Sequence, residues 1–205
     1  MITLNDTHFI AAGTNRACYV HPEDPNKCLK VVISGNNKES HREISYYQFL
    51  LKRDISWAMV ARFYGTQASN KGEAEVVELI RDNDDNISHS LDHYFRILTS
   101  EDELKKFIDL LIELKRYLFT ELIYVKDLNA VNIVYQKSSN ERGKLVVIDG
   151  LAYPNRFKAL NNIDFFTKKK INKSWKHFIW TLKKRCSSKY HKNLKILLIE
   201  SENQL

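Results

Sequence analysis

The chain has 205 residues, of which 43% are apolar and 11% aromatic, so it is large enough to bury a core as one large domain or two small lobes. This composition excludes a disordered chain, and no apolar run approaches the ~20 residues that a membrane-spanning helix needs. The start, MITLNDTHF, carries Asp6 and no basic cluster, so it does not predict a secretory signal. Three cysteines without metal-ligand spacing indicate reduced thiols, and we expect a cytoplasmic protein.

The net charge of +7 is concentrated at one end of the chain. Residues 165–199 contain eleven Lys or Arg and no Asp or Glu, whereas the remaining residues hold 21 basic and 25 acidic side chains. Such a block indicates contact with an anionic partner, such as a membrane or lipid surface, nucleic acid or a phosphorylated substrate, although a solvated helix face explains it equally well. Nucleic acid is not favoured as a partner, because no recognisable nucleic-acid-binding motif accompanies the charge.

The first eighty residues predict five strands and one helix. THFIAAG, ACYVHP and KCLKVVI predict three antiparallel strands from about Thr7 to Ile33, with a loop at HPEDPNK. VARFYGT and EAEVVELI predict a further hairpin through QASNKG. Between these strand groups, HREISYYQFLLK has a helical period, with N-cap candidates just before it. The candidates are Ser34, Asn36 and Asn37, and the apolar positions are Ile44, Tyr47, Leu50 and Leu51.

The second part of the chain predicts mainly helices. SEDELKKFIDLLIELKRYLFTELI begins with a capping box formed by Ser100 and Glu103. VNIVYQ and KLVVIDG predict a strand pair, and NKSWKHFIWTLKKRC and YHKNLKILLIES predict basic helices. The apolar faces of the first two helices are expected to be buried: Leu104, Phe107, Ile108, Leu111, Ile112 and Leu114 in one, and Trp175, Phe178, Ile179 and Leu182 in the other. The expected fold class is α+β, with a β-rich lobe over residues 1–81 and an α-rich lobe over 82–205.

The order of these elements, and of the polar residues that they carry, resembles that of the protein-kinase fold. A glycine turn comes first, then Lys30 on a strand and Glu43 on the following helix. After a long helix come Asp127 and Asn132, five residues apart, and Asp149 at the end of another apolar run. The resemblance predicts a two-lobed kinase-like fold with an antiparallel sheet in the first lobe and a reduced helical second lobe.

This resemblance implies a role for each of these residues in phosphoryl transfer from ATP. Lys30 would hold the α- and β-phosphates, paired with Glu43 or, one turn earlier on the same helix, with Glu39. Asp127 would accept the proton of the attacking hydroxyl or orient that hydroxyl. Asn132 and Asp149 would bind Mg²⁺ through oxygen atoms.

Further positions are assigned by the same resemblance, and several depart from the kinase pattern. Gly13 and Asn15, with Cys18, stand where a protein kinase has three glycines, and Arg16 in that loop is itself a candidate for phosphate contact. Val125-Lys126 replaces His-Arg, so Lys126 would supply the charge but not the bidentate geometry of arginine.

The segment that follows VVELI is expected to be the hinge between the lobes. The backbone from Glu78 to Ile80 would pair with adenine, and Asp82 would contact the ribose or form a plain turn. Gly150-Leu151 stands in place of Phe-Gly, and no Ala-Pro-Glu follows, so the peptide-docking half of a protein kinase is largely missing. These departures argue against a protein substrate more than against ATP binding.

A narrower resemblance rests on GTNRACYVHPEDPNKCLKV, HREISYYQFL, VVELIRDNDDNIS and VKDLNAVNIVY with VVIDGLA. Together these segments, over about residues 8–155, look like the bacterial YrbL family, which is named for the PhoP regulatory network and related in fold to protein kinases. The most specific piece is R-x-C-Y-x-H-P before C-x-K-V. The resemblance implies a small cytoplasmic kinase-like protein.

The leading functional hypothesis is an ATP- and Mg²⁺-dependent phosphotransferase that acts on a hydroxyl of an unknown small-molecule, glycan or lipid acceptor. The first alternative is a catalytically inactive pseudokinase that regulates a partner. The second is a protein that binds a membrane or nucleic-acid surface through residues 165–199. Cys18 and Cys28 could face each other across the two strands of the predicted hairpin, either as a redox bridge or, as the sequence favours, as two small buried thiols.

Overall fold

The computed structural model of the protein describes residues 1–139, 142–154 and 164–185. The described chain is of the expected α+β class and divides into two compact units, Met1–Ile87 and Ser88–Leu205. The predicted helix at residues 190–201 and the basic residues of the 165–199 block beyond Arg185 lie outside the described residues.

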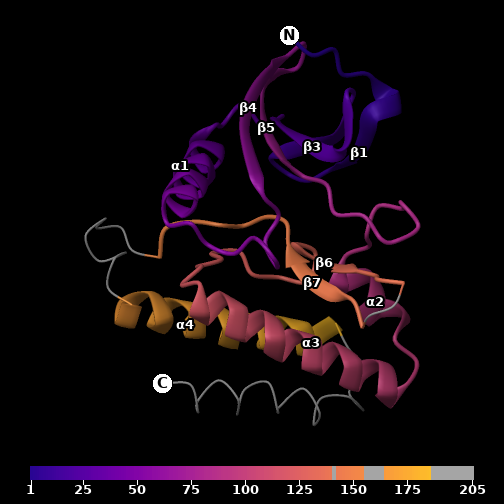
Figure 1. Cartoon of the computed structure of the whole chain (residues 1–205), viewed down its shortest axis with the longest axis vertical. Helices are drawn as coiled ribbons and strands as arrows, with labels where there is room; N and C mark the ends of the chain where they lie inside the picture. The colour runs from indigo at the N-terminus through magenta and orange to yellow at the C-terminus, as the bar shows by residue number, and fades with distance from the viewer. Residues whose placement is uncertain (140–141, 155–163, 186–205) are drawn as a thin grey trace. The chain divides into compact units, whose positions relative to one another are not determined.

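The first unit is built on a five-stranded antiparallel sheet with the strand order β1-β2-β3-β5-β4 (Figure 1). The strands, all of them predicted, are β1 (Phe9–Ala12), β2 (Arg16–His21), β3 (Asp24–Val32), β4 (Phe63–Ser69) and β5 (Gly72–Glu78). A short 3₁₀ turn, η1 (Asp6–His8), precedes them, and helix α1 (Lys38–Lys52) joins β3 to β4.

The prediction of a loop at HPEDPNK is wrong for most of this segment, because β3 already begins at Asp24. Only Pro22 and Glu23 form the turn. Pro25 is the second residue of the strand, where its missing N–H removes little from the ladder, and pairing with β5 starts only at Lys27. The long β3 that results carries Lys30 in its interior.

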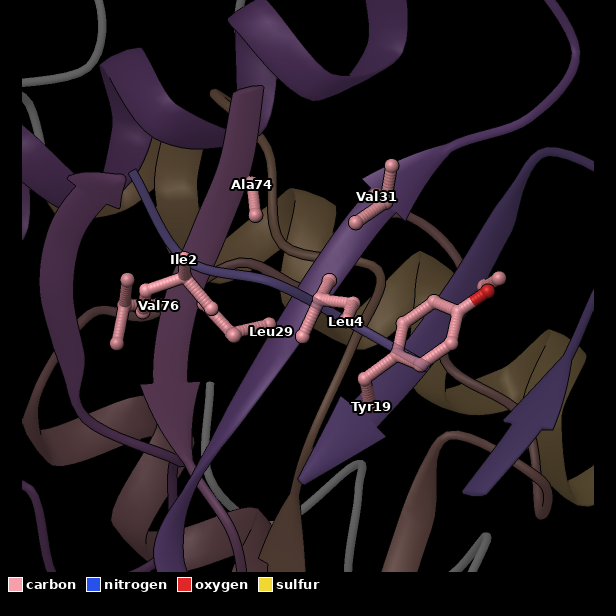
Figure 2. Close-up of a cluster of buried hydrophobic side chains, with 8 residues drawn as sticks. Ile2, Leu4, Tyr19, Leu29, Val31, Ala74 and Val76 are labelled. Carbon is pink, nitrogen blue, oxygen red and sulfur yellow. The ribbon is translucent and has the colours of Figure 1, made fainter. Parts of the chain in front are cut away.

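The two faces of this sheet differ in character. One face, with the N-terminal segment that runs past β4, forms an apolar core (Figure 2). Its members are Ile2, Leu4, Ala17, Tyr19, Leu29, Val31, Ala74 and Val76. The alternate residues of β2, β3 and β5 point to the opposite face, on which Tyr47 of α1 stacks against Phe63 with ring centroids 5.0 Å apart.

Helix α1 buries a slightly different set of side chains from the predicted one. Tyr47 and Leu50 are buried as expected, but Ile44 is half-buried and Leu51 is 42% exposed. Tyr46 takes their place in the core. Of the three N-cap candidates Asn37 occupies the position, although its side chain makes no capping hydrogen bond.

The second unit contains three described helices and a two-stranded sheet. The elements are α2 (Leu91–Ile97), α3 (Glu101–Thr120), β6 (Ile133–Gln136), β7 (Lys144–Val147) and α4 (Asp164–Arg185), and α3 and α4 lie side by side (Figure 1). The capping box of Ser100 and Glu103 is confirmed at the start of α3. The predicted buried faces of α3 and α4 are confirmed except for Ile112, which is half-buried.

Helix α2 was not predicted. It has only seven residues, too few for a helical period to stand out, and it is capped by Ser90, whose side chain accepts a hydrogen bond from the N–H of His93. None of the helices in the described part of the chain is long and apolar enough to cross a membrane.

Candidate functional site

The predicted site residues fall into two groups, one in each unit. The first unit carries Gly13, Asn15, Arg16, Lys30, Glu43, Glu78, Ile80 and Asp82, and the second carries Lys126, Asp127, Asn132 and Asp149.

In the second unit the Asp127 loop packs directly on the Asp149 turn. The N–H groups of Lys126 and Asp127 both donate to the carbonyl oxygen of Gly150, at 2.8 and 3.2 Å. One pairing step further on, the N–H of Ile148 donates to the carbonyl of Asn132 at 2.9 Å, where β6 and β7 begin their ladder. These backbone bonds bring together Asp127, Asn132 and Asp149, which are up to 22 positions apart in the sequence.

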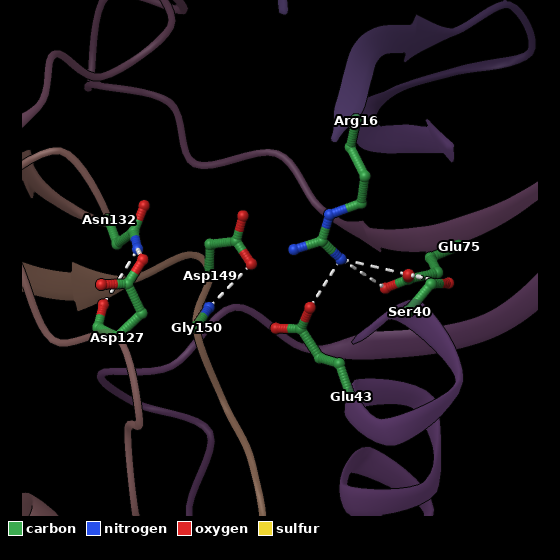
Figure 3. Close-up of polar contacts among 8 residues, drawn as sticks. All are labelled: Arg16, Ser40, Glu43, Glu75, Asp127, Asn132, Asp149 and Gly150. Carbon is green, nitrogen blue, oxygen red and sulfur yellow. Dashed lines mark hydrogen bonds and ion pairs between the residues drawn. The ribbon is translucent and has the colours of Figure 1, made fainter. Parts of the chain in front are cut away.

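Gly150 makes this close packing possible. Its φ of +83° is a left-handed conformation that glycine adopts without strain, and a Cβ at this position would lie 2.8 Å from the carbonyl oxygen of Asp127. The N–H of Gly150 also donates to Oδ1 of Asp149 at 2.7 Å, which fixes that carboxylate (Figure 3). A glycine after the aspartate is therefore a geometric requirement here.

Asn132 orients the Asp127 side chain. Its amide nitrogen donates to the backbone carbonyl of Asp127 at 2.9 Å and to Oδ2 of the same residue at 3.1 Å (Figure 3). Asp127 is exposed, whereas Asn132 and Asp149 are half-buried, and apolar neighbours on either side anchor the loop in the core. These anchors include Val125, which is 2% exposed, and Leu128, which is 5% exposed.

The three side chains offer oxygen atoms of the kind that Mg²⁺ prefers. Mg²⁺ is usually held by one or two carboxylates together with substrate phosphates and water. Within the described residues there is no cluster of three or more His, Cys, Asp or Glu side chains placed to hold a metal. A magnesium ion would be held by the carboxylate of Asp149 and the amide oxygen of Asn132, together with substrate phosphates and water, and this donor set fits it.

The first unit contains a buried polar cluster on the sheet face covered by α1. Glu43 and Glu75 are 4% and 2% exposed, Lys30 is 5% exposed, and Ser40 is 8% exposed. The register pairs Lys30 with Cys18 on one side and with Glu75 on the other, so the side chains of all three point to this face. Lys30 thus lies among acidic groups, as a buried cation must.

Arg16 binds both carboxylates of this cluster. Its Nη1 lies 2.5 Å from Oε2 of Glu43 and 3.1 and 3.2 Å from the two oxygens of Glu75, and Oγ of Ser40 donates to Oε1 of Glu75 at 2.5 Å (Figure 3). From the sequence, Arg16 was assigned to phosphate and Glu43 to Lys30, and neither Glu75 nor Ser40 was named. The strand order that places β5 beside β3 is the missing information, because no sequence pattern specifies it.

The predicted phosphate loop is the short turn between β1 and β2. The N–H of Gly13 donates to the carbonyl of Arg16 at 2.9 Å, and the carbonyl of Asn15 accepts from the N–H of Ile33 at 2.9 Å. A Cβ on Gly13 would come no closer than 3.9 Å to another atom, so space does not require glycine there. The turn leads directly into β2, on which Arg16 is the first residue.

The predicted hinge forms a turn of its own at the end of the first unit. The N–H of Asp82 donates to the carbonyl of Asn86 at 2.8 Å, and Asp82 is 6% exposed. The N–H of Glu78, one of the backbone groups expected near adenine, donates to the carbonyl of Arg62 at 2.8 Å. Ile80 is buried.

Fold and site together define an α+β protein of two units. One unit packs an Asp-x₄-Asn loop on an Asp-Gly turn, and the other holds a buried lysine–arginine–glutamate cluster on its sheet. Residues 2–183 match the model of the family described as PhoP regulatory network protein YrbL, and the chain belongs to this family. It is 30% identical over 182 residues, 87% of either chain, to the uncharacterized protein YrbL of Escherichia coli (strain K12). The YrbL of Shigella flexneri matches to the same extent.

Proposed function

We propose that the protein is an ATP- and Mg²⁺-dependent phosphotransferase with a two-lobed, protein-kinase-like fold. The observation that carries the proposal is the packing of the Asp127 loop on the Asp149–Gly150 turn, because it gathers the side chains needed at a hydroxyl and at a metal. The order of elements supports it as well: a turn before β2, Lys30 on β3, and Glu43 on the helix that follows β3.

In the proposed reaction an acceptor hydroxyl oxygen bonds to the γ-phosphorus of ATP. The bond from that phosphorus to the β,γ-bridging oxygen breaks, and ADP leaves with the electron pair. Asp127 takes the hydroxyl proton on its carboxylate, which Asn132 holds in place. Bound Mg²⁺, held by Asn132 and Asp149, would neutralise charge on the phosphates.

The first unit would supply the cations for the phosphates. Lys30 is buried on β3 opposite Glu75 of β5, and Lys126, which is exposed beside Asp127, would add a positive charge near the acceptor. The backbone from Glu78 to Ile80 and the Asp82 carboxylate would take the adenosine, and the turn of Gly13 and Asn15 would lie over the phosphates. We further propose that the protein works in the cytoplasm, where ATP is abundant and thiols such as Cys18 and Cys28 stay reduced.

The rival proposal is a pseudokinase, and the engagement of Glu43 by Arg16 favours it. The test is ATP turnover, measured as phosphate release, together with ATP affinity, in the wild type and in Asp127→Asn. An enzyme loses turnover and keeps its affinity, whereas a pseudokinase shows no turnover for the variant to lose. Asp109→Asn on α3 is the matched control, because it removes a half-buried carboxylate that lies 3.8 Å from Arg142 and outside the proposed site.

We also propose that α4 contacts an anionic lipid surface, which would bring the enzyme to a lipid or glycan acceptor. Phe165 is 62% exposed and Trp180 is 53% exposed, at opposite ends of the described helix. At 100° per residue the exposed lysines between them fall on the same side as these aromatic rings: Lys169, Lys170, Lys173 and Lys176. A lysine-rich face with aromatic residues is typical of helices that bind anionic membrane surfaces.

A further inference from the structure

The buried cluster of the first unit contains one more carboxylate than the proposed lysine–glutamate pair requires. Glu75 is 2% exposed, directly opposite Lys30 on the neighbouring strand, and bonded to both Arg16 and Ser40. A carboxylate buried this deeply is stable only with such partners. No role in phosphoryl transfer that the sequence predicts accounts for it.

The charges of the cluster balance. Two carboxylates, Glu43 and Glu75, face two cations, Arg16 and Lys30. Nη1 of Arg16 makes three hydrogen bonds to the carboxylates of Glu43 and Glu75. A phosphate that approached Arg16 would therefore have to compete with both carboxylates. The Glu75 carboxylate thus competes with a nucleotide phosphate for Arg16.

We infer that Glu75 is a positioning carboxylate of the proposed nucleotide site: fixed by Ser40, it holds Arg16 on Glu43 and so weakens the binding of phosphate. This inference rests on the proposed function, since it assumes that phosphates bind beside Lys30. Glu75 acts through Arg16 and touches no reacting atom, so it is a positioning residue.

The inference predicts a gain of affinity on removal of one negative charge. Glu75→Gln keeps the size of the side chain and an oxygen that accepts from Ser40, but leaves Glu43 alone to balance Arg16 and Lys30. We expect ATP in the presence of Mg²⁺ to bind at least about fivefold more tightly to this variant, because opposite charges a few ångströms apart interact strongly in a partly buried site. Adenosine, which carries no phosphate, binds as it does to the wild type.

The experiment is isothermal titration calorimetry with ATP and with adenosine on four proteins. They are the wild type, Glu75→Gln, the double variant Arg16→Gln/Glu75→Gln and the control Glu73→Gln. Glu73 lies two residues earlier on β5, exposed and bonded to Thr66, so the control makes the same charge change outside the cluster. The gain for ATP should be absent in the double variant and in the control.

Any other result contradicts the inference, the proposed function or both. If the wild type binds ATP but Glu75→Gln binds it equally or more weakly, the inference is wrong and the proposed function stands. A gain that survives the loss of Arg16, or that extends equally to adenosine, contradicts the positioning role. Absence of ATP binding in the wild type and all variants overturns both proposals. Should Glu75→Gln fail to fold, Ser40→Ala is the second variant, with an expected gain of about twofold in the same direction.

Discussion

Replacing Gly150 by alanine should displace the Asp127 loop. The added Cβ would lie 2.8 Å from the carbonyl oxygen of Asp127 and 3.1 Å from its Cβ, and real Cβ contacts are essentially never shorter than 3.0 Å. The backbone of Asp127 must therefore shift. The same substitution also forces an L-residue into a φ of +83°.

The magnitude follows from these two costs. Left-handed backbone costs an L-residue about 1–2 kcal/mol, and overpacking costs about 1–3 kcal/mol more. Gly35 separates the two, because it has a similar φ of +70° and a Cβ added there would meet no atom within 4 Å. Gly35→Ala should thus destabilise by about 1–2 kcal/mol, and Gly150→Ala by about 2–5 kcal/mol.

Urea unfolding gives the two free energies, and amide hydrogen exchange gives the local effect. The N–H groups of Lys126 and Asp127 donate to the Gly150 carbonyl. Their hydrogen-exchange rates should rise in Gly150→Ala and stay unchanged in Gly35→Ala. Equal destabilisation by the two variants, with exchange at Lys126 and Asp127 unaltered, would show that the glycine is not what holds the two segments together.

Three further predictions concern α3, the thiol pair and α4. Ser100→Ala removes the N-cap of α3 and should lower the free energy of unfolding by about 1 kcal/mol in urea titrations; no change would rule out a contribution of the capping box. The pKa of the Cys28 thiol is raised well above its ordinary value of 9.0, mainly by a hydrogen bond with Cys18 and secondly by burial. The unfolded chain therefore ionises first, and the stability that this thiol contributes is fully present below pH 9.0 and lost as the pH rises above it. Unfolding at stepped pH should show a steeper loss in the wild type than in Cys28→Ala, and parallel curves would refute the shift. Lys173→Glu should weaken binding to phosphatidylglycerol vesicles at least about fivefold and Lys105→Glu on α3 should not, whereas equal effects would exclude α4 as the contact surface.

Local patterns in the sequence were enough to predict most of the elements. Short apolar, β-rich runs mark the strands of both sheets, and the pair Ser100 and Glu103 marks the start of α3, because each of these signals depends on neighbours within a few positions. Helix α2 and the early start of β3 were missed for the same reason. A seven-residue helix has hardly two turns, too few for a helical period to be recognised in the sequence. Pro25 is typical of a loop, but it is the second residue of β3, where a strand can accommodate proline.

Of the candidate site, the sequence predicted the residues better than their partners. Asp127, Asn132 and Asp149 were named from their order and spacing, and they do come together in the second unit. The pairing of Arg16 with Glu43 and Glu75 was not foreseen, because it joins residues 27 and 59 positions apart through the order of strands β2, β3 and β5. Contacts of this kind depend on sheet topology, which local periodicity does not encode.

We propose above all that Asp149 belongs to a Mg²⁺-dependent nucleotide site. The most direct measurement is a thermal-shift titration with ATP, with and without Mg²⁺, on the wild type and on Asp149→Asn, a variant that keeps an oxygen to accept from the Gly150 N–H. We expect a rise in melting temperature with ATP that depends on Mg²⁺ in the wild type and is lost in the variant. No rise at millimolar ATP, or a rise that Asp149→Asn retains in full, would contradict it.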